Sequence, residues 1–292
     1  MKMLILPYYR QISSLFLGNT DYLVHFCTKF GKDFLLFEIM ATKIKQIVSA
    51  AQQGAILFGS WLDSNGMNAK SRYHYCATGW LEQLSKGVYK MEGSNPTLYA
   101  AVSSYNTQLS KQCIVGAYTA LDLRGYSHYA AMGKPKAYLF TDSQHKLPSW
   151  MLSREWDMTL CYTTTSFLGN DLLGVESMDV AGFELLISSA ERAMLECLHL
   201  PDSPSSLLDL FYIMEGLTTL RPRLVNQLLE RCSSVKVKRL FLYMAEKAGH
   251  QWYNSLNLEK IDLGNGRRMI SPTGKYIRKY NMTIPRELAE YE

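Results

Sequence analysis

A chain of 292 residues in which 47% are hydrophobic and 20% are charged has an ordinary globular composition, and its length suits two domains. The net charge of +5 is too small to indicate a nucleic-acid-binding protein by itself. No stretch approaches the roughly 18 apolar residues of a membrane-spanning helix, which argues against a membrane protein. The six cysteines stand singly, without a CxxC pair or a zinc-ligand spacing. We therefore expect mostly buried thiols, a reducing cytoplasm, no metal and no cofactor.

Residues 1–39 are predicted to be an extension of uncertain status. The first eighteen resemble a signal peptide faintly, but the apolar run breaks at Pro7 and no small-residue cleavage site follows. A helix-start pattern reappears at Met40, and Thr42 is placed to cap a helix that ends near Gln52. We expect the folded protein to begin near Met40, with 1–39 as translated upstream sequence or a loosely attached extension.

Residues 40–93 have the order of elements of a winged helix-turn-helix domain. After the helix that Thr42 caps, an apolar helix is predicted over 55–63 and ends at a Ser-Asn-Gly turn signal. Asn68 is placed to cap a second helix. Two short strands then flank a glycine-containing hairpin tip, at 80–84 and 88–91.

The second helix is where sequence specificity would reside. One face is expected to pack on the preceding helix through Ala69, Tyr73, Cys76 and Ala77. The polar side offers a cation, a hydroxyl, an imidazole and a phenol, which can reach base edges and phosphates in a major groove. The predicted DNA contacts are Lys70, Ser71, Arg72, His74 and Tyr75, with Lys86 at the hairpin tip.

Residues 97–292 are predicted to form a second domain. A polar-faced helix is expected over 97–109, and a buried helix that Gly125 ends over 113–126. A loop is expected at 148–150, and strands at 136–140, 156–164 and 183–187. Because strands interleave with helices, we predict an α+β protein in which the winged helix-turn-helix is followed by a mixed α/β C-terminal domain rich in helices.

From residue 188 the chain is predicted to be mainly helical. Ser188 and Glu191 have the spacing of a capping box, so Glu191 and Arg192 are expected at a helix start and surface. His199 is expected as a core or helix-end histidine. Helices are then predicted at 205–214, 222–232 and 234–248, and a strand–turn–strand at 261–270.

The helix at 234–248 is basic. Lys and Arg against Asp and Glu give a charge of +3 for residues 40–92, −6 for 93–220 and +5 for 221–250. The basic face of this helix is therefore either an ordinary solvated surface or a second binding patch. Such a patch would contact phosphates or an acidic partner. Four apolar residues are expected to face inward, namely Val237, Leu240, Phe241 and Met244. Lys236, Arg239 and Tyr243 are expected to face outward, and the predicted contacts are Lys236, Lys238 and Arg239.

Five motifs together resemble one protein family. They are Gly87-Val88-Tyr89, GAYTALDLRG at 116–125, FELLISSAERA at 183–193, VKVKRLF at 235–241 and IDLGNGRRMI at 261–270. The chain from about Met40 to Pro285 resembles the AbiEi antitoxins, the transcription-regulating halves of type IV abortive-infection toxin–antitoxin operons.

The resemblance implies a protein with two roles. Its N-terminal domain would bind inverted repeats upstream of its own operon and repress transcription. Its C-terminal domain would support that binding and oppose a nucleotidyltransferase-like toxin, without a stable complex between the two. No motif assigns individual residues to the antitoxin role.

Two other classes of function remain open from the residues alone. The winged helix could dock another protein and bind no specific DNA. An enzyme acting on nucleic acid would need a cluster of carboxylates, and no catalytic motif or such cluster is evident in the sequence. The Gly-Asn-Gly-Arg-Arg stretch at 264–268 could hold a phosphate, but we favour a tight hairpin turn. We therefore expect a DNA-binding regulator and not an enzyme.

Overall fold

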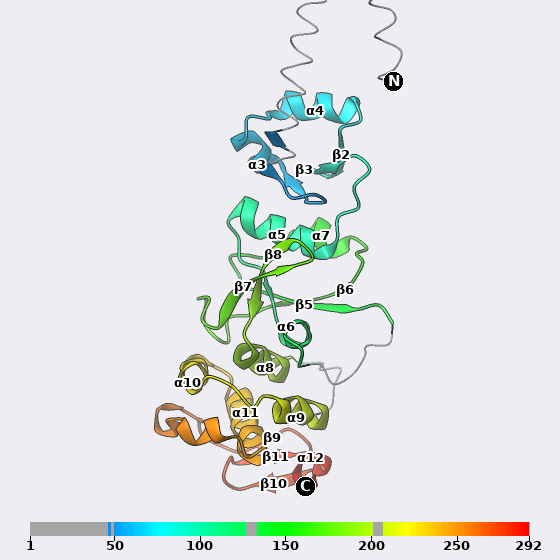
Figure 1. The fold of residues 1–292 in the computed structure, drawn as a ribbon. Helices are drawn as coiled ribbons and strands as arrows, with labels where there is room; N and C mark the ends of the chain where they lie inside the picture. Colours follow the sequence, from blue (N-terminus) through cyan, green and yellow to red (C-terminus); the bar gives the residue numbers. More distant parts are fainter. Residues whose placement is uncertain (1–45, 48–49, 127–132, 201–206, 292) are drawn as a thin grey trace, which may run out of the picture.

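Three separate β-sheets follow one another along an elongated molecule (Figure 1). The computed structural model describes residues 46–47, 50–126, 133–200 and 207–291. An N-terminal unit, residues 55–93, lies at one end, a central sheet lies in the middle, and a small C-terminal sheet lies at the other end. The predicted α+β fold class is confirmed. The extension 1–39 lies outside the described residues, as does most of the helix predicted to end near Gln52.

The N-terminal unit contains two helices and an antiparallel sheet with the strand order β1-β3-β2. Its elements are β1 (Leu57–Phe58), α3 (Gly59–Ser64), α4 (Ala69–Ala77), β2 (Leu81–Ser85) and β3 (Val88–Met91). A helix from residue 55 was wrong, because Leu57 and Phe58 pair with Tyr89 and Val88 of β3, and the helix begins only at Gly59. The β2–β3 hairpin and the helix after Asn68 were predicted correctly.

Strand β1 joins the N-terminal unit to the rest of the molecule. Because side chains alternate along a strand, Leu57 enters the core of the N-terminal unit, whereas Ile56 and Phe58 enter the main core. The free edge of β1 is closed by α5 (Leu98–Leu109). The Gln108 side chain accepts a hydrogen bond from the Phe58 amide (2.9 Å) and donates one to the Ile56 carbonyl (2.7 Å). Apolar contacts and the hydrogen bonds between the Gln108 side chain and the backbone of Ile56 and Phe58 therefore fix the orientation of the N-terminal unit.

The central sheet has the strand order β6-β5-β4-β8-β7. Its strands are β4 (Ile114–Val115), β5 (Lys136–Thr141), β6 (Thr159–Thr164), β7 (Val175–Val180) and β8 (Phe183–Ser188). The pairs β5–β6 and β4–β8 are parallel, and β4–β5 and β7–β8 are antiparallel. Helix α5 covers one face, and α6 (Ala117–Leu123) and α8 (Ala190–His199) cover the other (Figure 1).

Two predictions for this region were wrong, and one strand was not predicted. The segment 113–126 is not one helix, because its first residues form β4 in the middle of the sheet and α6 begins only after Gly116. The predicted loop at 148–150 opens a short helix, α7 (Ser149–Ser153). Strand β7, which pairs with β8, had not been predicted. A short apolar run does not reveal on its own whether it forms a strand or a helix.

A layer of helices packs on the far side of α8: α9 (Leu207–Gly216), α10 (Pro222–Arg231) and α11 (Val235–Lys247). These three helices were predicted. Ser234 caps α11 by accepting a hydrogen bond from the Val237 amide. The cap of α8 is Ser189 and not Ser188, whose side chain donates to Glu196 instead. Because helices and the sheet enclose α8, its residues are buried from Ala190 to Leu198.

Beyond the helices, two 3-10 turns (Gln251–Ser255 and Leu258–Lys260) lead into the C-terminal sheet. This sheet consists of β9 (Arg268–Met269), β10 (Lys275–Ile277) and β11 (Met282–Ile284), with α12 (Arg286–Glu290) after it. The strand order is β10-β11-β9, and β9 runs parallel to β11. The predicted hairpin at 261–270 was therefore wrong, because β9 pairs with a strand more than ten residues later.

Candidate nucleic-acid interface

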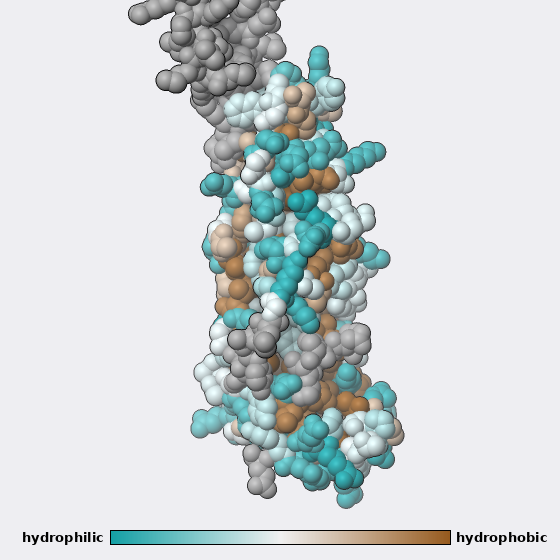
Figure 2. All heavy atoms as spheres, turned by 90° about the vertical axis from the view of Figure 1, so that its right-hand side faces the viewer, coloured by the Kyte–Doolittle hydropathy of each residue, from teal (hydrophilic) through white to brown (hydrophobic). Residues whose placement is uncertain are grey.

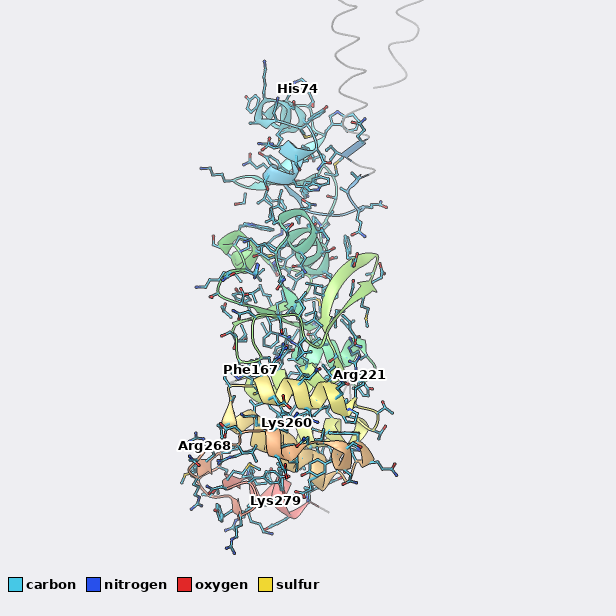
Figure 3. All side chains as sticks on the ribbon, turned by 90° about the vertical axis from the view of Figure 1, so that its left-hand side faces the viewer. His74, Phe167, Arg221, Lys260, Arg268 and Lys279 are labelled. Carbon is cyan, nitrogen blue, oxygen red and sulfur yellow. The ribbon has the colours of Figure 1, made fainter. Side chains whose placement is uncertain are left out.

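Helix α4 lies at the end of the described part of the molecule opposite the C-terminal sheet (Figure 1), and its outer side is exposed. Asn68 caps it by accepting a hydrogen bond from the Ser71 amide (3.0 Å), as the sequence predicted. The Ser71 hydroxyl also donates to the Asn68 side chain (3.1 Å), so Ser71 is partly committed to the cap. Lys70 and His74 are exposed. Figure 3 shows His74 at the end of the molecule that lies farthest from the C-terminal sheet.

Arg72 and Tyr75 lie on the inner side of α4, so the prediction that they face outward was wrong. Tyr75 is 2% exposed and belongs to the core of the N-terminal unit. Arg72 donates to the Asp63 carboxylate (2.5 Å) and to the carbonyls of Gly59 (3.1 Å) and Met67 (2.7 Å). Hydrogen bonding to Asp63 raises the pKa of Arg72. Arg72 therefore holds α3 and α4 together.

The prediction that Ala69, Tyr73 and Ala77 face inward was wrong, because all three are exposed. Tyr73 is 79% exposed, and it shares the outer face of α4 with Lys70 and His74. Trp80, which follows the helix, is 46% exposed. The spacing allowed either face to be the inner one, since Arg72, Tyr75 and Cys76 also recur at helical intervals. This end of the molecule therefore exposes two large aromatic residues, Tyr73 and Trp80.

The β2–β3 hairpin places Lys86 at its exposed tip, where Gly87 takes the left-handed conformation (φ +72°) that the turn requires. On the hairpin itself, Lys90 pairs with Glu82 (2.9 Å). Among the four Lys and Arg residues from 55 to 93, the exposed ones are thus Lys70 on α4 and Lys86 on the hairpin.

The residues of α11 that were predicted to contact DNA differ in their exposure to solvent. Lys236 is exposed, but Lys238 and Arg239 are only 5% and 2% exposed. Tyr243 is also buried, so the predicted outward face does not exist beyond Lys236. The reason is that the C-terminal sheet and its connections cover this side of the helix. The four residues predicted to face inward are all fully buried.

Arg239 anchors the loop that precedes β9. Its guanidinium donates to the carbonyls of Leu263 (2.9 Å), Gly266 (2.8 Å), Gly264 (2.9 Å) and Asn281 (2.9 Å). Burial and, next, the charge of Arg268 lower the pKa of Arg239. Its donors are therefore engaged by the protein's own backbone, and a phosphate cannot reach them in this fold.

Ion pairs connect α8 to its surroundings, so the prediction that Glu191 and Arg192 lie at the helix surface was wrong. Arg221 donates to the buried Glu191 carboxylate at 2.9 and 3.1 Å and also reaches Glu176. Burial by itself raises the pKa of Glu191, but the hydrogen bonds from Arg221 outweigh it and lower that pKa to about 2. Arg124 completes the group through Glu176 (2.8 Å).

Glu196 is completely buried one turn after Arg192. It accepts hydrogen bonds from Arg192 Nε (2.8 Å), the Ser188 hydroxyl (3.0 Å) and the Ala117 amide (2.9 Å). This arrangement joins α8, β8 and α6 around one carboxylate whose partners are all within the protein. His199 ends α8 and stacks on Phe167 (3.9 Å between centroids), which confirms the prediction of a helix-end histidine.

Two negative findings apply to the described ranges. No three His, Cys, Asp or Glu side chains in these ranges come together in a way that could hold a metal ion. No helix within the same ranges is long and apolar enough to cross a membrane.

Comparison with known proteins places the chain among transcriptional regulators. Residues 134–285 match the family model described as "Transcriptional regulator, AbiEi antitoxin, Type IV TA system". Residues 40–132 match the model described as "Transcriptional regulator, AbiEi antitoxin N-terminal domain". The chain therefore belongs to the AbiEi family of antitoxins and transcriptional regulators of type IV toxin–antitoxin systems, as its motifs predicted.

Similarity to a solved structure concerns the fold. The crystal structure of the RV2827C protein from Mycobacterium tuberculosis superposes with a TM-score of 0.55 at 13% sequence identity. The match covers 85% of this chain and 92% of that chain, so the two proteins share their architecture over most of their length. No curated protein matches this chain.

Proposed function

We propose that this regulator is a sequence-specific DNA-binding autorepressor that reads the DNA upstream of its own gene with α4 and the β2–β3 hairpin. The observation that carries the proposal is the exposed outer face of α4, where Lys70, Tyr73 and His74 project from a capped helix. A capped helix followed by a basic hairpin is the winged arrangement in which the helix enters a major groove and the wing contacts phosphate.

The proposed division of labour follows the chain. Residues 40–93 would bind DNA, and residues 97–292 would form the regulatory and antitoxin domain in the cytoplasm. The hydrogen bonds between β1 and α5 support a fixed orientation of the DNA-binding unit. In a dimer, such a fixed orientation would set the spacing of inverted repeats. We propose a nucleotidyltransferase-like toxin as the antagonised partner, without a stable complex. Co-expression of the toxin with this protein should restore growth.

The direct test is a salt titration of the full chain on the DNA upstream of its gene and on a scrambled duplex of equal length. Tyr73→Ala and His74→Ala should lower the preference for the native duplex. Lys86→Ala should weaken binding to both duplexes equally and reduce the salt slope by about 0.9, the value for one phosphate. Lys134→Ala, an exposed lysine beside the central sheet, is the matched control. If all three variants bound both duplexes as tightly as the unaltered protein does, α4 and the hairpin would not form the DNA interface.

A second candidate function is protein docking by the same face. It is favoured by the exposed rings of Tyr73 (79%) and Trp80 (46%), since aromatic residues dominate protein interfaces. Under this function, Trp80→Ala would abolish capture of a protein partner, and the protein would show no preference for its own upstream DNA at physiological salt.

A further inference from the structure

The C-terminal sheet has an outward face that the proposed repressor function does not use. In its register Tyr276 lies opposite Thr283, which lies opposite Met269, so these three side chains point to the same side. The other side holds Met282 and Ile284, which are fully buried. Tyr276 is 45% exposed and Met269 is 65% exposed, so an aromatic ring and a thioether lie open to solvent on one flat face.

Arg267 is fixed on this face beside Tyr276. Its Nε and Nη2 donate to the Thr283 hydroxyl at 3.0 and 2.8 Å. Its guanidinium carbon lies 4.6 Å from the centre of the Tyr276 ring. The Tyr276 hydroxyl in turn donates to Asn281 (2.9 Å). Ring and guanidinium are therefore held in place before any ligand arrives, which lowers the entropy that binding costs.

The sheet and its loops are strongly basic. Between residues 260 and 279 there are six Lys and Arg residues and one Asp. Lys279 pairs with Glu246, but within the described ranges Arg268, Lys275 and Arg278 are exposed and form no ion pair. Figure 2 shows hydrophilic residues beside apolar surface at this end of the molecule, and Figure 3 shows Arg268 and Lys279 at the opposite end from His74. In the same register Arg268 lies opposite Met282 and Lys275 lies opposite Ile284, so these two cations belong to the inner side of the edge strands β9 and β10. Exposed positive charge therefore surrounds the stacking surface at the edges of the sheet.

We propose that the outward face of the C-terminal sheet binds a single-stranded nucleic acid, with a base stacked against the Tyr276–Arg267 pair and phosphates reaching the exposed cations at the edges of the sheet, Arg268, Lys275 and Arg278. Proteins that bind single strands combine a basic surface with exposed rings on which unstacked bases lie. A base inside a duplex cannot present its π-face to such a surface, and no long helix projects from this sheet to enter a groove. An acidic peptide would be attracted by the cations but would gain nothing from the ring.

The test uses the full chain and fluorescently labelled oligonucleotides of about 12 nucleotides, a site size within the range known for such surfaces. Oligouridine and oligothymidine represent RNA and DNA single strands, and a duplex of the same length is the comparison. Binding is followed by fluorescence anisotropy. Tyr276→Ala should lower single-strand affinity about tenfold, whereas Tyr276→Phe should stay within about twofold because the ring remains. Arg268→Ala should reduce the salt slope by about 0.7.

Lys86→Ala on the distant hairpin separates this proposal from the repressor function, because it should leave single-strand affinity unchanged. If both single strands bind more tightly than the duplex, the contact is with base and phosphate, which RNA and DNA share. A preference for oligouridine or oligothymidine identifies whether RNA or DNA is bound. Retained affinity in Tyr276→Ala would overturn the proposal. So would an equal loss of duplex affinity in Tyr276→Ala, or displacement of the oligonucleotide by polyglutamate at equal charge concentration, which would mark an acidic partner.

Discussion

Replacement of Arg239 by methionine distinguishes a structural arginine from a DNA contact. Methionine keeps the apolar stem but leaves the carbonyls of Leu263, Gly264, Gly266 and Asn281 without their donor. Hydrogen bonds to a charged group contribute about 1.5–3 kcal/mol each, so four would give an upper bound near 6–12 kcal/mol. The loop is partly exposed, so water replaces some of these partners, and the variant no longer buries a charge. We expect a net loss of about 3–5 kcal/mol.

The assay is equilibrium unfolding in urea, followed by tryptophan fluorescence. Trp252 packs near Phe241 of α11 (6.1 Å between ring centroids), so it reports on this layer. Lys236→Met on the same helix is the matched control, and it should change the free energy of unfolding by less than about 0.5 kcal/mol because Lys236 is exposed. If Arg239→Met were as stable as the unaltered protein while its DNA salt slope fell by about 0.9, Arg239 would be a phosphate contact and our reasoning would be refuted.

Three further predictions concern other buried contacts. Gly116→Ala should lower the free energy of unfolding by about 3 kcal/mol or more in urea, because the added Cβ would lie 2.2 Å from a Glu196 carboxylate oxygen; an unchanged midpoint would contradict this packing. Glu191 has a folded pKa of about 2 against an ordinary 4.5, so its stabilisation is present above pH 4.5 and lost as the pH falls toward 2. Between about pH 7 and pH 3 we expect a loss of about 1–2 kcal/mol after allowance for the exposure of Arg221, and Glu191→Gln should remove that part of the pH dependence. Arg72→Met should destabilise the N-terminal unit by about 2–3 kcal/mol, as measured by hydrogen exchange of its amides, whereas exposed Lys70→Met should have almost no effect.

The predictions that succeeded rest on local chemistry. Asn68 as a helix cap, Gly87 in the hairpin turn and the apolar stripe of α11 depend on residues within a few positions of one another. Each involves a backbone group or spacing that only certain side chains satisfy, and sequence therefore reveals it. The family motifs were likewise visible in the sequence, and the match over residues 40–285 confirms them.

The errors concern partners that are distant in the chain. β1 is a strand because β3 lies about thirty residues later and α5 closes its other edge, as shown by its hydrogen bonds with Gln108. β9 pairs with β11 although β10 lies between them in the sequence. A run of two or three residues carries no signal for such pairing, since strand propensity depends on the neighbour it meets.

By itself, the sequence determined the family, the α+β class, most helices and the β2–β3 hairpin. Only the tertiary structure decided which polar side chains face solvent. Helical spacing offers two faces, and a buried cation such as Arg72 or Arg239 is stable only where carbonyls or a carboxylate converge on it. That convergence is a property of several distant segments. For this reason Tyr73, and not the predicted Tyr75, lies on the outer face of α4. For the same reason the exposed basic surface lies on the C-terminal sheet and not on α11, where it was predicted.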